Sequence, residues 1–271
     1  MGARGGSRRL GLVFSMVGMV ATCLLSACGA AAPQAASSSP SSSSSSAASS
    51  TGTSGAPTTC VAGQAGFVGG ITVPEEPASG VATLTSNCWA QIAPTPIANL
   101  IPGVGTAQVP GGKNPTVQAA WTSNDLYLKC NVYAWPLYAA SASAPATDDA
   151  CEFMVAGSTS RTGTFSPHEA HITIAYNSTT PALGTHGSAL NSLAGFTAQN
   201  SVQSGKGYMI ELTVPWSALG VTAPAKGNSY AFDAAVDYNN AQGQYVAYAD
   251  ITGTNNHPCC YTNSWTSITL G

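Results

Sequence analysis

The chain has 271 residues, of which 8 are Lys or Arg and 11 are Asp or Glu, so only 7% are charged. A soluble domain usually has about 25% charged residues. Nucleic-acid binding needs clustered basic side chains that neutralise phosphates, and this composition excludes nucleic acid as a partner. From Cys28 onward five basic residues stand against all eleven acids, so the surface of the mature chain must be mostly neutral and polar.

Residues 1–27 have the organisation of a secretory signal peptide, with three arginines before an apolar run from Leu10 to Leu25. The run ends in Leu-Ser-Ala-Cys, which resembles a bacterial lipobox, where cleavage before the cysteine is followed by its acylation. Cys28 is therefore expected to be a lipid anchor that holds the protein in the cell envelope, facing outside the cytoplasm. Because Gly29 rather than Asp follows it, the outer membrane is favoured in a cell with two membranes.

Residues 28–59 form a linker in which eleven of the fourteen positions between 37 and 50 are Ser. Such a segment cannot bury enough apolar surface to offset the entropy of ordering, so we expect it to be disordered. A flexible linker of this length has an average reach of about 30 Å. It would hold the following domain away from the membrane.

Residues 60–271 have the composition of one folded domain with mostly two-residue periodicity. In the stretch 126–132, for example, Leu126, Leu128 and Cys130 share one face, and Lys129 lies on the other, as in a half-buried strand. Similar alternation, bounded by turn residues, predicts strands around 117–120, 126–132, 151–155, 171–176, 208–214, 230–237, 245–250 and 267–270.

The segment 215–220, Pro-Trp-Ser-Ala-Leu-Gly, predicts the one helical turn, since Pro suits a helix start and Gly a helix end. The fold class expected is all-β, an antiparallel β-sandwich of about eight to ten strands with one short helical turn. The signal peptide and the disordered linker precede it.

Six cysteines remain after the lipobox, an even number that favours disulfides in an exported protein. Cys130 and Cys151 each share a face with the apolar residues of their own strand, so the two sulfurs could meet if those strands pair. The other bridges would then join Cys60 and Cys88 to Cys259 and Cys260, because adjacent cysteines rarely bond each other.

Six segments resemble, in order, the family 9 carbohydrate-binding modules and their DOMON-related relatives. They are 120–132 (AWTSNDLYLKCNV), 149–155 (DACEFMV), 170–176 (AHITIAY), 207–220 (GYMIELTVPWSALG), 229–237 (SYAFDAAVD) and 265–270 (WTSITL). The resemblance implies an antiparallel β-sandwich that binds neutral oligo- or polysaccharide without cleaving it, and it could accompany glycoside hydrolases. It also makes Ca²⁺ a candidate ion, although no loop here has the alternating acidic spacing of a calcium loop.

The ligand positions that the resemblance carries over are Glu152, Asn255 and Asn256. Two tryptophans that clasp the sugar in family members are missing here, since Ala146 stands at one position and residues 255–258 read Asn-Asn-His-Pro. Sugars need an aromatic face and groups that bind hydroxyls, so exposed loop residues are candidates to replace them. The neighbouring loops provide Trp135 and Tyr261, together with Tyr133 and Tyr138.

Each candidate also has a purely structural interpretation. Glu152 and Glu211 lie opposite the apolar residues of their strands, so a solvated face is as good an interpretation as a site. Two alternative functions stay open: a haem-carrying electron-transfer sandwich domain and a structural envelope protein that has lost its sugar site. The haem alternative would use Met or His ligands, and the candidates are Met154, Met209, His168 and His171.

Overall fold

The computed structural model describes residues 59–62, 70–102, 109–139, 147–184, 190, 192–252 and 260–271. All of them belong to one compact unit, residues 53–271. The signal peptide, Cys28 and most of the linker therefore lie outside the described residues. Among the described residues, no helix is both long enough and apolar enough to span a membrane.

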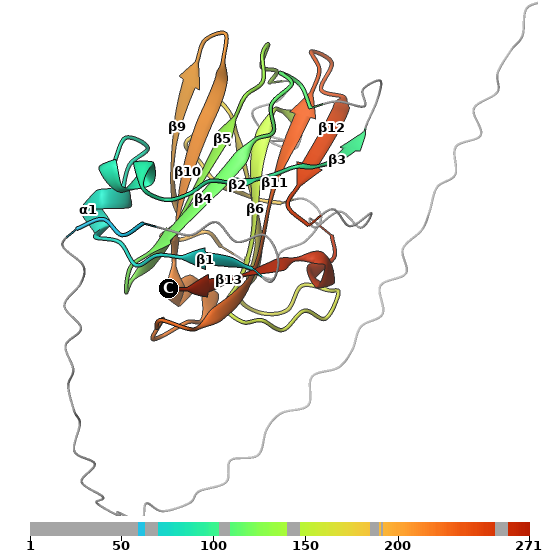
Figure 1. Cartoon of the computed structure of the whole chain (residues 1–271). Helices are drawn as coiled ribbons and strands as arrows, with labels where there is room; N and C mark the ends of the chain where they lie inside the picture. Colours follow the sequence, from blue (N-terminus) through green and yellow to red (C-terminus); the bar gives the residue numbers. More distant parts are fainter. Residues whose placement is uncertain are drawn as a thin grey trace, which may run out of the picture. The chain divides into compact units, whose positions relative to one another are not determined.

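One sheet of the fold has five strands in the order β2-β4-β5-β10-β9, and all neighbours in it are antiparallel (Figure 1). The central strands are long and apolar on the face that lines the core, whereas β9 is a polar edge strand. The strands are β2 (Thr95–Pro96), β4 (Thr116–Trp121), β5 (Asp125–Val132), β9 (Thr197–Gln203) and β10 (Gly207–Pro215).

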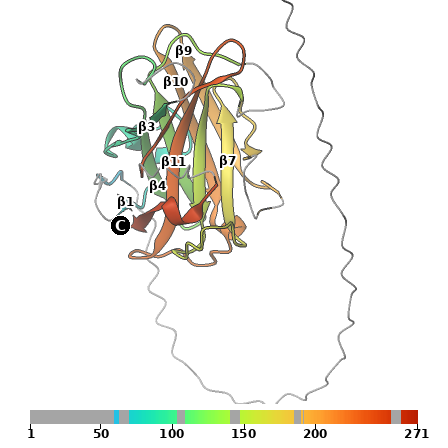
Figure 2. The same ribbon diagram turned by 90° about the vertical axis from the view of Figure 1, so that its right-hand side faces the viewer.

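The second sheet has eight strands, with β11, β6 and β7 side by side at its centre (Figure 2). Its order is β1-β13-β11-β6-β7-β8, and β12 and β3 extend it from β11. The pair of β1 and β13 is parallel, and the other pairs are antiparallel. The strands are β1 (Ile71–Val73), β3 (Asn99–Pro102), β6 (Ala150–Ala156), β7 (Glu169–Ala175), β8 (Ala182–Leu183), β11 (Ser229–Asn239), β12 (Tyr245–Asp250) and β13 (Thr266–Leu270).

The main core lies between the two sheets and includes apolar residues of both. Cys130 on β5 and Cys151 on β6 form a disulfide there, with their Cα atoms 6.6 Å apart. The bridge that alternation predicts is therefore present, but β5 and β6 do not pair with each other. They belong to different sheets, and the disulfide joins the sheets across the core.

The segment 76–92, here called the N-terminal cap, covers the outer face of the five-stranded sheet. It contains α1 (Ala78–Val81) and the 3₁₀ helix η1 (Asn87–Ala90). Gln118 of β4 donates hydrogen bonds to two carbonyls of the cap, those of Trp89 and Ile92. As a result, Tyr127 and Lys129 are buried, and the outer face of this sheet is not solvated as its alternation suggests.

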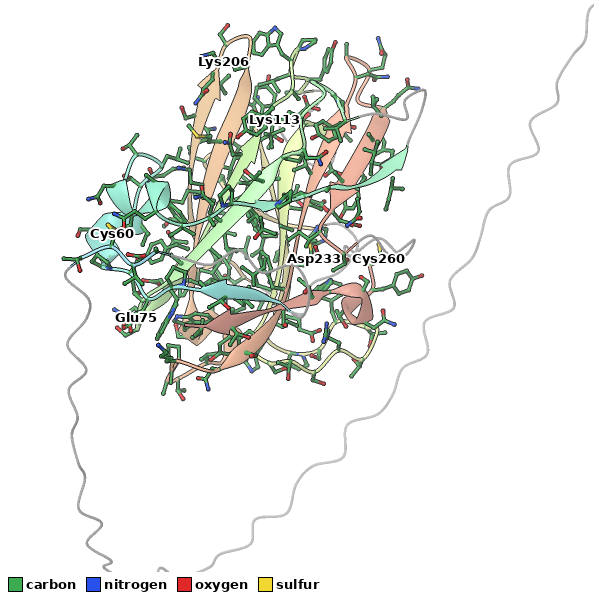
Figure 3. The ribbon with its side chains drawn as sticks, in the orientation of Figure 1. Cys60, Glu75, Lys113, Lys206, Asp233 and Cys260 are labelled. Atoms are coloured by element: carbon green, nitrogen blue, oxygen red, sulfur yellow. A yellow bond between two sulfur atoms is a disulfide. The ribbon has the colours of Figure 1, made fainter. Side chains whose placement is uncertain are left out.

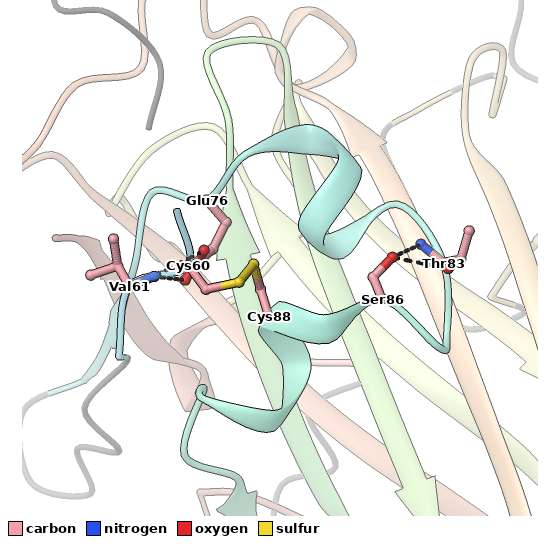
Figure 4. The surroundings of a disulfide bond; sticks show 6 residues. All are labelled: Cys60, Val61, Glu76, Thr83, Ser86 and Cys88. Atoms are coloured by element: carbon pink, nitrogen blue, oxygen red, sulfur yellow. Dashed lines mark hydrogen bonds between the residues drawn. A yellow bond between two sulfur atoms is a disulfide. The ribbon is translucent and has the colours of Figure 1, made fainter. Parts of the chain in front are cut away.

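The cap is fastened by a disulfide between Cys60 and Cys88, whose Cα atoms are 5.1 Å apart (Figure 4). Beside it, the Val61 N–H donates to both carboxylate oxygens of Glu76, at 2.9 and 3.1 Å. The expectation that Cys60 and Cys88 bond Cys259 and Cys260 is wrong, because the turn from α1 to η1 brings Cys88 back to Cys60. Cys259 lies outside the described residues.

The all-β sandwich predicted from the sequence is confirmed, and each of the eight predicted strands is present. The helical turn is the 3₁₀ helix η3 (Trp216–Leu219), which ends at Gly220 in the left-handed conformation with φ 71°. The structure also contains elements that the sequence does not predict, namely further strands, α1, η1 and the 3₁₀ helix η4 (Thr262–Ser264). The described residues therefore form more strands than the eight to ten expected.

Candidate functional site

Glu152 lies at the centre of the outer face of the eight-stranded sheet, in one cross-strand row with Thr173 and Ala235. Its side chain is buried, with 4% of its surface exposed. One carboxylate oxygen is 3.1 Å from Nε2 of His171, and the other accepts the Tyr248 hydroxyl at 3.1 Å. Thr173 contributes a longer contact, 3.4 Å from its hydroxyl to the first oxygen.

Burial and the neighbouring groups together shift the pKa values of Glu152 and Asp237 in opposite directions. Burial disfavours the charged form of Glu152, but the His171 charge and hydrogen bonds from His171, Asp237 and Tyr248 outweigh it and hold the pKa of Glu152 below its ordinary value. Burial and the neighbouring Glu152 carboxylate raise the pKa of Asp237 well above its ordinary value. Within this coupled pair the negative charge is thus favoured on Glu152 and the proton on Asp237.

Neighbouring protein groups enclose Glu152 and His171 and shield them from solvent. A Cβ atom at Gly184 would stand 1.9 Å from Nδ1 of His171, so the backbone of this loop lies directly against the imidazole. Both carboxylate oxygens of Glu152 are engaged by protein groups. The sequence allowed a solvated face or a site here, and the structure shows neither a solvated face nor an accessible carboxylate at Glu152.

An open cleft of about 250 Å³ lies at the end of the sandwich where β5 ends and β6 begins, beside the β11–β12 hairpin. Lys113 and Lys206 mark this end in Figure 3, and Asp233 and Cys260 lie well away from it. Trp135 is 48% exposed and forms part of the cleft wall. Other residues that line it are Tyr138, Asp149, Tyr238, Asn239 and Asn240.

Asp149 joins two walls of this cleft. One of its carboxylate oxygens accepts the Tyr138 N–H at 2.9 Å, and the other accepts the Asn239 N–H at 2.7 Å. Burial raises the pKa of Asp149 to about 6, against the effect of these two hydrogen bonds. Asp149 is therefore a positioning residue that fixes the loop after β5 against the end of β11.

Among the described residues, the predicted site residue Tyr261 is not brought to this cleft. Tyr261, 49% exposed, precedes η4 and β13, and β13 pairs with β11 at Ser229–Phe232, the end opposite Asn239. Asn255 and Asn256 lie outside the described residues. Sequence reasoning placed Asp149 in the family-like segment 149–155 without giving it a role in a cleft, and it missed Asn239, which no spacing distinguishes from an ordinary turn residue.

A second buried acid, Glu211 of β10, contacts the N-terminal cap and is not part of an accessible site. Trp89 Nε1 donates to it at 3.2 Å, and Lys129 Nζ donates to the Leu84 carbonyl at 2.9 Å. Burial raises the pKa of Glu211 to about 7, whereas the Trp89 hydrogen bond and Lys129 act in the other direction. The interpretation of Glu211 as a solvated residue is therefore wrong, because the N-terminal cap packs over it.

The described residues do not fit the Ca²⁺ that the resemblance suggests. Calcium takes six to eight oxygen ligands. Asp233 is a fully buried candidate, but its oxygens already accept the backbone N–H groups of Ala234 and Ile251 and the Thr252 hydroxyl. Burial raises its pKa to about 8. Cys60, Glu76 and Cys88 also lie together, but the two sulfurs are bonded to each other.

The candidate haem ligands are not arranged around a common space. Met154 and His171 are neighbours across β6 and β7, and both are fully buried. Met209 belongs to β10 in the other sheet. Because His171 packs against Gly184 and Glu152, no porphyrin fits beside its imidazole.

Comparison with known proteins identifies relatives of this sandwich. The family described as "Carbohydrate family 9 binding domain-like" matches residues 82–270. Two solved structures are similar, both of a family 9 carbohydrate-binding module from Caldicellulosiruptor kristjanssonii. The structure in complex with cellotriose is 17% identical and has a TM-score of 0.60, and the match covers 74% of this chain and 92% of that one. The structure in complex with glucose is 17% identical and has a TM-score of 0.61, with 74% and 95% covered.

No curated protein matches the chain. At 17% identity the two structures establish the shared fold alone. The family match is more specific, because it extends from the cap to the last strand and takes in both sheets. This chain therefore belongs to the carbohydrate family 9 binding domain-like proteins.

Proposed function

We propose that this domain binds neutral carbohydrate without cleaving it. The family match over residues 82–270 is the observation that carries the proposal. The relatives from Caldicellulosiruptor kristjanssonii hold cellotriose and glucose on the same fold. The sparsely charged chain agrees with a ligand whose hydroxyls, rather than charges, are recognised.

The arrangement of the acids favours binding over hydrolysis. A glycosidase needs two carboxyl groups about 5–10 Å apart across a cleft that admits the substrate. Glu152 and Asp237 are buried within one network, and both oxygens of Asp149 accept backbone N–H groups. These described acids are engaged in holding the fold, which leaves them poorly placed for acid and base roles.

The test of this function is a calorimetric titration of the domain with six sugars: glucose, galactose, mannose, xylose, N-acetylglucosamine and cellotriose. We expect saturable binding of at least one of them. Cellotriose incubated with the protein should also remain intact when its products are separated by chromatography. Absence of binding to all six would overturn the proposal and favour an envelope protein that kept the fold and lost the ligand.

We further propose that the domain works at a membrane surface, tethered through lipidated Cys28 and the linker of residues 28–59. The lipobox-like end of the signal peptide and the serine-rich composition support this. A tether raises the local concentration of a binding module near polysaccharide at the cell surface. The Cys28→Ala variant should lose acyl labelling and leave the membrane fraction, whereas unchanged fractionation and labelling would contradict the anchor.

A further inference from the structure

Sugar recognition by an aromatic face requires a ring that solvent can reach. All five tryptophans of the chain are described, and four are buried, with exposed fractions of 4% or less. Trp89 and Trp216 also use their indole N–H groups in hydrogen bonds within the protein. Trp135 is thus the one tryptophan available to stack on the C–H face of a sugar ring.

The cleft beside Trp135 adds polar groups to this aromatic wall. Within the described residues, neither the Trp135 indole N–H nor the hydroxyl of the half-buried Tyr138 has a hydrogen-bond partner. At the base of the cleft, the Tyr238 hydroxyl and the Asn239 side-chain oxygen are enclosed and also lack a partner in the described part of the chain. Buried polar groups are normally hydrogen-bonded, so this base retains bonding capacity for a hydroxyl or for a water that accompanies it.

The size and charge of the cleft narrow the ligand class. A volume of about 250 Å³ lies below the 300–1,000 Å³ typical of drug-sized ligands, and it suits a single small ring. Asp149 is the one charged residue among the described residues that line the cleft. Each of its carboxylate oxygens accepts a backbone N–H group. Lys113, at the same end, places its ammonium 3.7 Å from the centre of the Tyr133 ring. The cleft therefore favours a neutral ring with hydroxyl groups.

Two other regions lack these properties. A larger hollow of about 540 Å³ lies at the start of β5, but its aromatic residue, Trp216, is buried and donates to the Thr122 carbonyl. The Glu152 network offers a carboxylate, but that carboxylate is already bonded on both oxygens and covered. Neither region presents an exposed ring and uncommitted polar groups together.

We infer that the carbohydrate-binding site of this domain is the cleft of Trp135, Tyr138 and Asn239, at the β11–β12 hairpin end, and that it receives one neutral sugar ring. This inference rests on the proposed function and gives that function a site. Trp135 would stack on the ring, and Tyr138 and the groups at the base would bind its hydroxyls. Glu152, in contrast, would contribute to stability and not to affinity.

The test uses the sugar that binds the domain most tightly among the six named above, titrated calorimetrically into matched variants. Trp135→Ala removes the proposed stacking face, and Tyr261→Ala removes an equally exposed ring at the other end of the sandwich. We expect Trp135→Ala to lower affinity at least about tenfold and Tyr261→Ala to change it less than about twofold. Trp135→Phe, which keeps an aromatic face, should lose less than Trp135→Ala.

Each outcome bears on one of the two proposals. If the domain binds a sugar and Trp135→Ala binds it as tightly, the site is elsewhere and the proposed function stands. A tenfold loss in Glu152→Gln with none in Trp135→Ala would place the sugar on the outer face of the eight-stranded sheet and overturn the inference. If the unaltered domain binds none of the six sugars, the function itself fails and the inference fails with it. Unchanged circular dichroism spectra establish that the variants are folded.

Discussion

The Glu152 network and the Trp135 cleft lie on the same domain and differ in what surrounds their polar groups. At Glu152 every nearby partner is protein, and the carboxylate is buried among His171, Tyr248 and Asp237. At Trp135 an aromatic ring faces solvent above polar groups that lack partners among the described residues. A buried carboxylate with protein partners on both oxygens indicates a structural role for Glu152. An exposed ring above unused hydrogen-bonding capacity indicates a binding role.

The largest effect is expected from breaking the buried network. Glu152→Ala removes the carboxylate that His171 and Tyr248 contact, and it leaves those groups buried without their partner. We expect the free energy of unfolding, measured by urea denaturation, to fall by about 3 kcal/mol. Glu152→Gln, which keeps the shape and one acceptor, should lose clearly less. Equal stability of Glu152→Ala and the unaltered domain would show that the network contributes nothing.

The disulfide between the sheets gives the next effect, of similar size. Cys130→Ala combined with Cys151→Ala removes a bridge between residues 21 apart in sequence, for which chain entropy gives about 3 kcal/mol. The sugar affinity of the folded variant should stay within about twofold, because the bridge lies in the core rather than in the cleft. A loss of sugar affinity without a loss of stability would contradict this separation.

The pH dependence of stability reports the buried acids outside the Glu152 network. Asp149, Glu211 and Asp233 have pKa values raised to about 6, 7 and 8, mainly by burial. The folded state therefore holds these protons more tightly than the unfolded state. Their contribution to stability is complete below about pH 4 and is lost as the pH rises through about 6 to 8.

We expect the free energy of unfolding to fall by several kcal/mol between pH 5 and pH 9, measured by urea denaturation at each pH. The variant Asp233→Asn should flatten the part of this dependence above pH 7. Glu152 acts with the opposite sign, because its pKa is lowered in the folded state. It stabilises the fold at pH values above the ordinary pKa of a glutamate, and this contribution is lost on acidification. Stability that rises steadily from pH 5 to pH 9 would show that the three raised pKa values are wrong.

The smallest effect on stability is expected at the cleft. Trp135→Ala changes an exposed ring and should alter the free energy of unfolding by less than about 0.5 kcal/mol. Thermal unfolding of this variant beside Glu152→Ala gives the comparison directly. A large destabilisation by Trp135→Ala would show that the ring holds the loop after β5 in place and would weaken its assignment to binding.

The sequence predicts the long strands well because their two-residue alternation reflects a face packed on the core, as in β5 and β10. It does not predict β2 and β8, which have two residues each, or β9, an edge strand whose apolar residues are only Ala198 and Val202. Alternation also identifies two faces without showing what covers the second. The N-terminal cap over Lys129 and the closed surroundings of Glu152 therefore appear only in the structure.

The candidate site was partly predictable. Trp135 follows a predicted strand in a loop, where an exposed aromatic residue is a reasonable ligand candidate. Its partners in the cleft come from the start of β6 and the end of β11, far apart in sequence. Asp149 positions those walls by accepting two backbone N–H groups. No pattern in the sequence predicts such contacts. Tyr261 shared the same sequence signal as Trp135, and the topology places it at the other end.

The most direct measurement of the central claim is a sugar titration followed by the ¹H–¹⁵N NMR signals of the five tryptophan indole groups. The signal absent from Trp135→Phe identifies Trp135. With the tightest-binding sugar of the six, this signal should shift in a saturable way, with the midpoint found by calorimetry, while the four signals of the buried tryptophans stay nearly in place. Saturable sugar binding that leaves the Trp135 signal unmoved would contradict the assignment of the cleft as the binding site.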